Sequence, residues 1–473
     1  MPPDASPSRC RVPLGARPAR RSFLVSRDSP DYLNTLACVR CGLCLAVCPT
    51  YAVEKVEMQS PRGRVALIRA ASEGRLDVKS PILRDHVYNC LDCRACETIC
   101  PSGVRVGHLV LGARAESEQA TRHSFGEWLV RLVAFRFVLV SGARLATFTR
   151  FARLYQSLGL ERLVRGSGVL RMLPGKLGLL AELEALIPEI PARPLHEELP
   201  EVLPAYGERR HRVGFFLGCF MSALLAETSR KTVEVLRRNG CEVVTPPGQW
   251  CCGAPHAEEG DFESQRRFAR HNVDLFARYD LDYVVTDCAA CGAETKGYEK
   301  LLADTPAYAK RAAAFSARVR DISELLAEVG IDPPGRQVAV RATYHEPCHL
   351  CHAQGIRKQP RDLLRSIPGL ELVELPESDW CCGSAGVYNV THAERAGKLL
   401  DRKMANVAGT DADVVVTGNP GCLLQLAAGV TGTHSRQRVA HPIELLAEAY
   451  GIGQPSAHGA KASAKSRRPR SDR

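Results

Sequence analysis

The chain has 473 residues, enough for about three domains of typical size. Its 45% hydrophobic and 24% charged residues are an ordinary globular balance, which excludes a mainly disordered, collagen-like or fibrous protein. The net charge of +11 gathers at the two ends, where residues 1–21 hold five Arg against one Asp and residues 453–473 hold six Lys or Arg against one Asp. The remainder is near neutral, which argues against a nucleic-acid partner.

Composition and hydrophobic spacing divide the chain into six segments. The fold class we expect is a multidomain α+β protein in which helices come first and two α/β lobes follow. The expected segments are a disordered basic tail over 1–28, a compact helical domain over 29–112, a helical segment with a Pro-rich linker over 113–207, a first lobe over 208–330, a second lobe over 335–452, and a second disordered basic tail over 453–473.

Short β-rich runs alternate with helical stretches in the second half of the chain. Residues 213–217 and 282–286 are strand candidates, and residues 232–239 between them read as a helix that ends before Gly240. This alternation favours α/β layering in each lobe.

The second half also repeats itself. Three sequence landmarks recur in the same order at nearly constant offset: Phe216-Leu217-Gly218-Cys219 with His345-Glu346-Pro347-Cys348, Gln249-Trp250-Cys251-Cys252-Gly253 with Asp379-Trp380-Cys381-Cys382-Gly383, and Asp282-Tyr283-Val284-Val285-Thr286 with Asp413-Val414-Val415-Val416-Thr417. We therefore predict two duplicated Cys-Cys-Gly lobes that face each other across a pseudo-two-fold axis.

Two cysteine motifs in the first domain have the spacing of a bacterial two-cluster ferredoxin. Each has the form Cys-x2-Cys-x2-Cys-x3-Cys-Pro, and they begin at Cys38 and Cys90. Three thiolates on one tight loop can cap three corners of an iron–sulfur cube, while the fourth cysteine ligates the neighbouring cluster. The predicted ligands are Cys38, Cys41, Cys44 and Cys100 for one 4Fe-4S cluster, and Cys90, Cys93, Cys96 and Cys48 for the other.

A structural zinc module is the alternative for these motifs, because Cys-x2-Cys pairs also bind zinc. Zinc sites seldom use two linked runs of four cysteines that each end in proline, so iron–sulfur clusters are favoured. Two clusters packed in one small fold lie close enough for fast electron transfer. The first domain is therefore interpreted as an electron-transfer domain.

The two lobes carry a further set of cysteines, for which we predict an additional thiolate metal site, with an iron–sulfur cluster as one form of it. A redox dithiol and buried structural cysteines are the alternatives. Asn419 stands where the repeat has Cys288, with Cys351, His349 and His352 as nearby substitutes, and Cys10 and Cys241 match nothing. The candidate ligands are Cys219, Cys251, Cys252, Cys288 and Cys291 in the first lobe, and Cys348, Cys381, Cys382 and Cys422 in the second.

Weaker signals have less specific interpretations. The histidines around Cys348, which are His345, His349 and His352, are interpreted as polar loop residues in preference to metal ligands. Residues 60–64 are predicted to form a turn, with a partner-binding patch as the alternative. Residues 122–151 are expected to pack on the lobes, with an amphipathic membrane-surface segment as the alternative.

The sequence contains neither G-x-G-x-x-G nor G-x-x-x-x-G-K-[ST]. We therefore expect no flavin in this chain, and an electron-transfer protein without its own two-electron centre needs a partner that has one.

No stretch of about 18 uncharged apolar residues is evident in the sequence, and no signal peptide is evident either. The cysteine spacings favour a reducing compartment. The expected location is the cytoplasm, with a peripheral position on the cytoplasmic face of the inner membrane as the alternative.

Together these motifs resemble the iron–sulfur subunits of glycolate oxidase (glycolate dehydrogenase). The resemblance covers about residues 31–450 and rests on Cys48-Pro49-Thr50-Tyr51, Ser60-Pro61-Arg62-Gly63-Arg64, Cys100-Pro101-Ser102-Gly103-Val104-Arg105, His352-Ala353-Gln354, Cys381-Cys382-Gly383-Ser384-Ala385-Gly386 and Gly421-Cys422. Cys288 completes a Cys-x2-Cys as in heterodisulfide-reductase-type lobes, whereas Asn419 breaks the same pair in the second lobe.

The resemblance implies a subunit of an oxidoreductase that acts on the CH-OH group of a 2-hydroxy acid. Flavin-bearing dehydrogenase subunits would oxidise glycolate to glyoxylate, and this chain would carry the electrons to quinone or another respiratory carrier without catalytic residues of its own. The alternatives are the equivalent subunit for D-lactate or glycerol 3-phosphate, and a heterodisulfide-reductase-like enzyme whose lobes cleave a disulfide.

Overall fold

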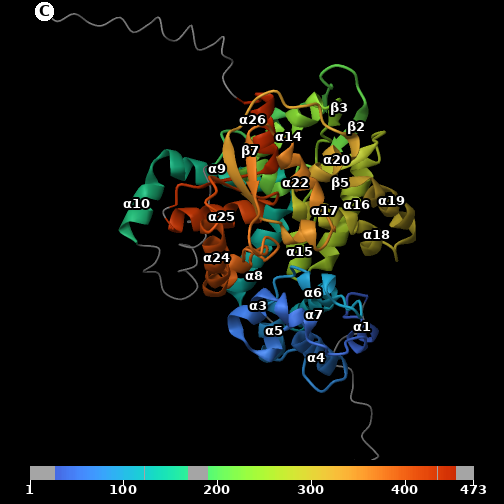
Figure 1. The fold of residues 1–473 in the computed structure, drawn as a ribbon. Helices are drawn as coiled ribbons and strands as arrows, with labels where there is room; N and C mark the ends of the chain where they lie inside the picture. The colour runs from blue at the N-terminus through green and yellow to red at the C-terminus, as the bar shows by residue number, and fades with distance from the viewer. Residues whose placement is uncertain (1–26, 122, 169–189, 434, 454–473) are drawn as a thin grey trace, which may run out of the picture.

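The computed structural model describes residues 27–121, 123–168, 190–433 and 435–453. A small helical unit at the N-terminus lies beneath two α/β lobes, and a helical arm runs along one side of the lobes (Figure 1). The predicted α+β class with two duplicated lobes is confirmed.

The N-terminal unit is built around three helices, α4, α5 and α7, whose apolar faces form its core. Ile68, Leu83 and Leu109 are completely buried there. Its elements are α1 (Tyr32–Leu36), α2 (Leu43–Ala46), α3 (Pro49–Glu54), η1 (Glu57–Gln59), α4 (Pro61–Ser72), α5 (Pro81–Tyr88), α6 (Ala95–Thr98) and α7 (Val106–Ala120).

The prediction of a turn over residues 60–64 is wrong, because these residues begin helix α4. The Ser60 hydroxyl accepts a hydrogen bond from the amide of Gly63 at 3.0 Å, and Pro61 occupies the first helical position. The helix packs so closely on η1 that a Cβ at Gly63 would lie 2.0 Å from the Glu57 carbonyl oxygen. Glycine is therefore required for close approach of two backbones, which spacing alone does not reveal.

Replacing Gly63 with alanine is expected to destabilise the N-terminal unit by about 3 kcal/mol, the upper range for overpacking against backbone that cannot move aside. Gly397→Ala is the matched control, because Gly397 lies within helix α24 and a Cβ there meets no atom within 4 Å. Thermal unfolding followed by circular dichroism should show a lower melting temperature for Gly63→Ala and an unchanged or higher one for Gly397→Ala.

The helical arm follows the N-terminal unit. Within the segment over 113–207 that is predicted to be helical with a Pro-rich linker, helices are observed as far as Ser167, and residues 169–189 lie outside the described residues. In the described part of the chain no single helix is long and apolar enough to cross a membrane, although the pair Leu132–Val140 and Gly142–Ser157, bent by 109°, meets the length and composition test. The elements are α8 (Phe125–Arg131), η2 (Leu132–Phe137), η3 (Val138–Val140), α9 (Gly142–Ser157), α10 (Leu160–Ser167) and α12 (Leu195–Glu198).

Each lobe is built on a parallel sheet, and the two sheets have equivalent strand orders, β3-β2-β4-β5 and β7-β6-β8-β9. The first lobe adds β1 as an antiparallel edge strand. The two strand candidates correspond to β2 and β4. The strands are β1 (Val202–Leu203), β2 (His211–Phe215), β3 (Cys241–Val244), β4 (Tyr283–Thr286), β5 (Val319–Asp321), β6 (Val340–Tyr344), β7 (Leu370–Val373), β8 (Val414–Val416) and β9 (Arg438–Ala440).

Helices cover both sheets. The helix predicted over 232–239 is the second half of α14. The first lobe has α13 (Cys219–Leu224), α14 (Ala226–Arg238), α15 (Ala254–Glu258), α16 (Phe262–Phe276), α17 (Ala289–Lys296), α18 (Tyr298–Leu301), α19 (Pro306–Arg318) and α20 (Ile322–Val329); the second has α21 (Cys348–Cys351), α22 (Lys358–Arg365), α23 (Tyr388–Thr391), α24 (Ala393–Ala408), α25 (Pro420–Gly432) and α26 (Pro442–Tyr450).

The lobes pack on each other through two equivalent helix contacts, in which the roles of the two lobes are reversed. Helix α14 of the first lobe packs on α26 of the second, while α22 of the second lobe packs on α20 of the first. Because α14 corresponds to α22 and α20 to α26 in the repeat, the two contacts are equivalent. One apolar core therefore runs through both lobes and includes Phe215, Val285, Tyr344 and Val416.

The N-terminal unit docks on both lobes through polar contacts. Arg114 of α7 donates a hydrogen bond to the Glu258 carbonyl of the first lobe at 2.7 Å. In the second lobe, the hydroxyl of Tyr388 donates to the side-chain oxygen of Asn89 at 2.5 Å, and Arg395 pairs with Glu54 at 2.9 Å. These contacts hold the N-terminal unit against the lobes (Figure 1).

Candidate functional site

Two neighbouring cavities in the N-terminal unit are lined by cysteines. The first is lined by Cys38, Cys41, Cys44 and Cys100, and the second by Cys48, Cys90 and Cys93, while Cys96 borders both. Each cavity thus combines thiols of one motif with the last cysteine of the other motif. This is the exchange that the sequence motif predicts.

The loops that carry these thiols are equivalent to each other. Helices α2 and α6 each start after a residue with positive φ, Gly42 at 89° and Arg94 at 60°. This turn of the backbone brings the cysteines on either side of it around one cavity. The first cavity reaches the surface, where Cys41 is exposed, whereas Cys48 and Cys93 of the second are buried.

Positive side chains surround the second cavity. The Arg64 guanidinium lies 4.0 Å from the Cys48 sulfur, and Arg114 donates a hydrogen bond to the Cys90 carbonyl at 2.5 Å. Burial raises the pKa of the Cys90 thiol, while Arg64 and Arg114 act in the opposite direction. Four convergent thiols with cations behind them suit a cofactor that carries thiolate-bound iron.

In the first lobe, five thiols meet at the carboxyl edge of the sheet, where loops after β2, β3 and β4 converge. The sulfurs of Cys219 and Cys251 are 3.6 Å apart, and Cys252 interacts with Cys291, which in turn interacts with Cys288. All five are buried. The structure therefore brings together every candidate ligand of this lobe.

Within this cluster Cys251 is the thiol that ionises most readily. Hydrogen bonds from Cys219, Cys252 and His256 lower the pKa of Cys251, whereas interaction with Cys251 and burial raise the pKa of Cys219. Five buried, convergent thiols are a soft donor set of the kind that thiophilic metals prefer.

The second lobe repeats this arrangement with one thiol fewer. Cys348 interacts with Cys381, and Cys382 interacts with Cys422. The amide of Gly383 donates to the Cys381 sulfur at 3.4 Å, as the amide of Gly253 does to Cys251 in the first lobe. The four candidate ligands of this lobe are therefore also adjacent.

Asn419 occupies the place of the missing thiol and turns partly toward the first lobe. Its side-chain oxygen accepts a hydrogen bond from the amide of Ala290 at 3.1 Å, and its amide group lies 3.7 Å from the Cys422 sulfur. The proposed substitutes are occupied elsewhere: His349 contacts the Asp92 carbonyl, His352 contacts the Asp379 carbonyl, and the Cys351 thiol donates to the Cys348 carbonyl.

His345 is the histidine that lies beside the thiols of the second lobe. One of its ring nitrogens and the sulfurs of Cys382 and Cys422 all lie within 4.8 Å of one another. The sequence places three histidines near Cys348 but does not distinguish them. The distinction depends on His345 being at the end of β6, where its amide donates to the Val416 carbonyl of β8 at 2.9 Å.

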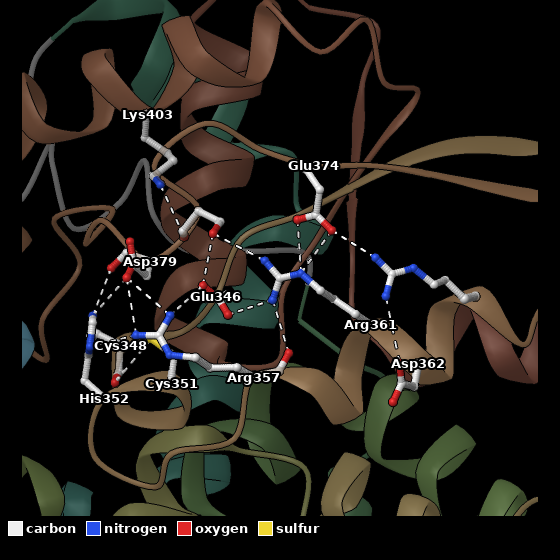
Figure 2. Close-up of polar contacts among 12 residues, drawn as sticks. Glu346, Cys348, Cys351, His352, Arg357, Arg361, Asp362, Glu374, Asp379 and Lys403 are labelled. Atoms are coloured by element: carbon white, nitrogen blue, oxygen red, sulfur yellow. Dashed lines mark hydrogen bonds and ion pairs between the residues drawn. The ribbon is translucent and has the colours of Figure 1, made fainter. Parts of the chain in front are cut away.

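An ion-pair network fixes the loop after His345 (Figure 2). The buried Glu346 carboxylate accepts hydrogen bonds from Arg361 at 2.7 Å, Arg357 at 3.1 Å and the Ser378 hydroxyl at 3.0 Å. Lys403 of α24 donates to the carbonyls of Glu377 and Ser378. Burial lowers the pKa of Lys403 to about 8, while Cys382 and Cys381 act in the opposite direction.

The second cavity of the N-terminal unit lies directly against the second lobe. Cys93 and Cys381 belong to the same buried apolar cluster, with Cys348 packed against it. Burial and the nearby Cys381 and Cys348 thiols raise the pKa of Cys93. The thiol groups therefore form a succession from the exposed Cys41 through the second cavity to the second lobe.

Cys10 lies outside the described residues, and Cys241 is buried within β3. The two tryptophans of the repeat have packing contacts, since Trp250 stacks on His271 at 3.9 Å and Arg402 lies over the Trp380 ring at 4.0 Å.

The half-buried carboxyl group of Glu258 lies where the three units meet. Burial raises the pKa of Glu258 to about 8 and the nearby Asp92 acts in the same direction. A Cβ at Gly386 of the second lobe would lie 1.7 Å from the Glu258 carboxylate, which shows how closely the units approach. Between pH 4.5 and 8 the folded chain therefore binds a proton that the unfolded chain has released.

The melting temperature is accordingly expected to fall as the pH rises from 6 through about 8, because the folded-state pKa of Glu258 is raised and its contribution to stability is lost above that value. Glu258→Gln should flatten this dependence and raise the melting temperature at alkaline pH relative to the unchanged chain. Differential scanning fluorimetry across this range checks the sign. An unchanged pH profile in the variant would refute the assignment.

Comparison with known proteins agrees with this geometry. Residues 34–104 match a 4Fe-4S dicluster domain, residues 126–187 match the linker region of the glycolate oxidase iron–sulfur subunit, and residues 213–295 and 342–427 match a cysteine-rich domain. The two cavities and the two lobe clusters thus fall within the matched iron–sulfur and cysteine-rich domains.

Three relatives illustrate the similarity. The chain is 39% identical to the probable glycolate oxidase iron–sulfur subunit of Bacillus subtilis, over 91% of this chain and 97% of the relative. It is 31% identical to the glycolate oxidase iron–sulfur subunit of Escherichia coli, over 87% of this chain and 93% of the relative. It is 33% identical to lactate utilization protein A of Halalkalibacterium halodurans, over 50% of this chain and 93% of the relative. The chain therefore belongs to the family of glycolate oxidase iron–sulfur subunits and is an iron–sulfur electron-transfer subunit.

Proposed function

We propose that this chain receives electrons from flavin-bearing dehydrogenase subunits that oxidise glycolate to glyoxylate, and delivers them to a respiratory acceptor such as quinone. The observation that carries the proposal is the succession of thiol groups from the exposed Cys41 to Cys93 and on to Cys348 and Cys381. The names of the two full-length relatives support glycolate as the donor.

The proposed cofactors are two 4Fe-4S clusters in the N-terminal unit and a further thiolate-bound iron site in the lobes. Cys38, Cys41, Cys44 and Cys100 would hold one cluster, and Cys48, Cys90, Cys93 and Cys96 the other. When bound, such clusters accept and release one electron at a time. The chain supplies the thiolates, buries the second set and keeps both sets next to the lobes. We propose that the flavin belongs to the partner subunits and not to this chain.

Dye reduction by anaerobic cell extract tests the choice of donor. Extracts with and without this chain are offered glycolate, D-lactate and glycerol 3-phosphate separately. Loss of the glycolate-driven rate alone is expected. An unchanged glycolate rate together with loss of another donor's rate would contradict the assignment of glycolate.

D-lactate is the second candidate donor, because lactate utilization protein A is similar to half of this chain. If glycerol 3-phosphate is the donor, the chain still requires a flavin-bearing partner. A heterodisulfide-reductase-like activity of the lobes predicts instead that disulfide-linked turnover proceeds without any flavoprotein, which the same extracts can show.

We further propose that the chain is cytoplasmic and binds the inner membrane surface through its helical arm. Phe137, Phe148, Phe151 and Leu158 of the arm are each at least 58% exposed, and residues 123–168 contain seven Arg against two Glu. Exposed aromatic and leucine side chains between arginines suit an anionic lipid surface.

The arm should hold the chain on anionic vesicles at low salt and release it when Phe148 and Phe151 are both replaced by serine. Flotation with phosphatidylglycerol vesicles, and with phosphatidylcholine vesicles as the control, measures this. Failure of the unchanged chain to float with anionic vesicles would contradict membrane binding and favour the flavin-bearing subunits as the partner of this face.

A further inference from the structure

His345 is a buried histidine whose two ring nitrogens find no hydrogen-bond partner among the residues that the structure describes. It is 1% exposed, and it lies at the end of β6 beside Cys382 and Cys422. An unpaired imidazole in the interior costs free energy, so a side chain kept in this state needs a compensating interaction. The thiols of Cys382 and Cys422 lie close to one of its ring nitrogens, so the three side chains together offer three ligands to a metal.

The equivalent place in the first lobe has no such group. There the repeat has Phe216, which is 1% exposed and packs against Phe276, while five thiols complete the cluster. The second lobe has four thiols, Asn419 in place of the fifth, and His345 in place of the phenylalanine. The imidazole therefore appears in the lobe that lacks a thiol.

The surroundings hold His345 in this position. Its own amide is bonded to β8, and Glu346 beside it is fixed by Arg357 and Arg361 (Figure 2). The neighbouring His349 has a ring nitrogen 3.2 Å from the Asp92 carbonyl and so faces the N-terminal unit. His345 is consequently the histidine available to the thiols of this lobe.

We propose that His345 is a nitrogen ligand of an iron–sulfur centre in the second lobe, together with Cys382 and Cys422. It takes the place of the thiolate that Asn419 cannot provide. A neutral imidazole in place of a thiolate removes one negative charge from the ligand set and raises the reduction potential of the iron. The two lobes would then hold centres of different potential. This inference extends the proposal that the lobes bind iron.

Nitrogen hyperfine spectroscopy on the purified, dithionite-reduced chain tests this ligand without glycolate or a partner, so its outcome is independent of the choice of donor. The unchanged chain, with and without ¹⁵N-labelled histidine, is compared with His345→Ala and His345→Cys. The control is His441→Asn, because His441 is a buried histidine of the same lobe whose two ring nitrogens contact the Asp287 carbonyl and the Ile443 amide.

A strong nitrogen coupling that changes with histidine labelling is expected in the unchanged chain and in His441→Asn. It should be absent from His345→Cys, which should retain the iron and show a lower reduction potential because the thiolate is restored. A coupling that persists in both His345 variants, or no histidine coupling in the unchanged chain, would overturn the proposal. Iron content that does not fall in a Cys382→Ser, Cys422→Ser double variant would also overturn it.

Discussion

Replacing Cys48 with serine is expected to cost the chain about four iron atoms, those of the cluster whose other ligands are Cys90, Cys93 and Cys96. Cys48 belongs by sequence to the first motif, yet its side chain lies in the second cavity, between Thr50 and the Arg64 guanidinium. Electron transfer from the flavoprotein should fall by about 100-fold or more, because the succession of sites is interrupted next to Cys348 and Cys381.

Double variants show which cluster is lost. Cys48→Ser with Cys90→Ser removes two ligands of one site and should lose no more iron than either change alone. Cys48→Ser with Cys38→Ser affects both sites and should lose about eight iron atoms. Cys241→Ser is the control, since Cys241 is a buried thiol within β3 that belongs to neither cavity. The reverse pattern of iron loss would refute the exchange of ligands between motifs.

Replacing Arg64 with methionine should destabilise the N-terminal unit by about 3 kcal/mol, because a charged donor is removed from several buried acceptors. Arg64 is 1% exposed and donates to the His86 carbonyl at 2.7 Å and to Thr50 and Gln59 at 2.9 Å. The same change removes a cation that lies 4.0 Å from the Cys48 sulfur, so the second cluster should also be lost more readily to oxygen.

Arg62→Met is the matched control, two residues away on the same helix. Arg62 forms an ion pair with Glu57 whose side chains are 27% and 53% exposed, and such pairs contribute less than about 1 kcal/mol. Urea unfolding measures the difference between the two variants. Equal destabilisation by both would contradict the role assigned to the buried arginine.

Much of this architecture can be predicted from the sequence, because the spacing of the cysteines determines which of their thiols can reach one cluster. The motifs at Cys38 and Cys90 identify the thiols that the two cavities bring together, and the repeat of Cys-Cys-Gly around Cys251 and Cys381 identifies the two lobes. The repeat also identifies Asn419 as the position that lacks a thiol.

Other features depend on contacts between distant segments and have no local signal. The approach of Gly63 to η1 is one of them, although the start of α4 itself has a local signal in the Ser60 N-cap and Pro61, which the prediction of a turn does not use. His345, His349 and His352 are equivalent in sequence, and only the docking of the N-terminal unit and the pairing of β6 with β8 separate them. The position of the second cavity against Cys381 likewise follows from the packing of whole units.

The most direct test of the central claim follows electrons into the purified chain. The chain with its iron–sulfur centres is mixed anaerobically with its flavin-bearing subunits, and glycolate is added while the visible absorbance and the paramagnetic signals of the iron are recorded. The account predicts bleaching and the appearance of reduced-cluster signals with glycolate, and their loss in Cys48→Ser but not in Cys241→Ser. Reduction by dithionite but not by glycolate with its flavoprotein would contradict it.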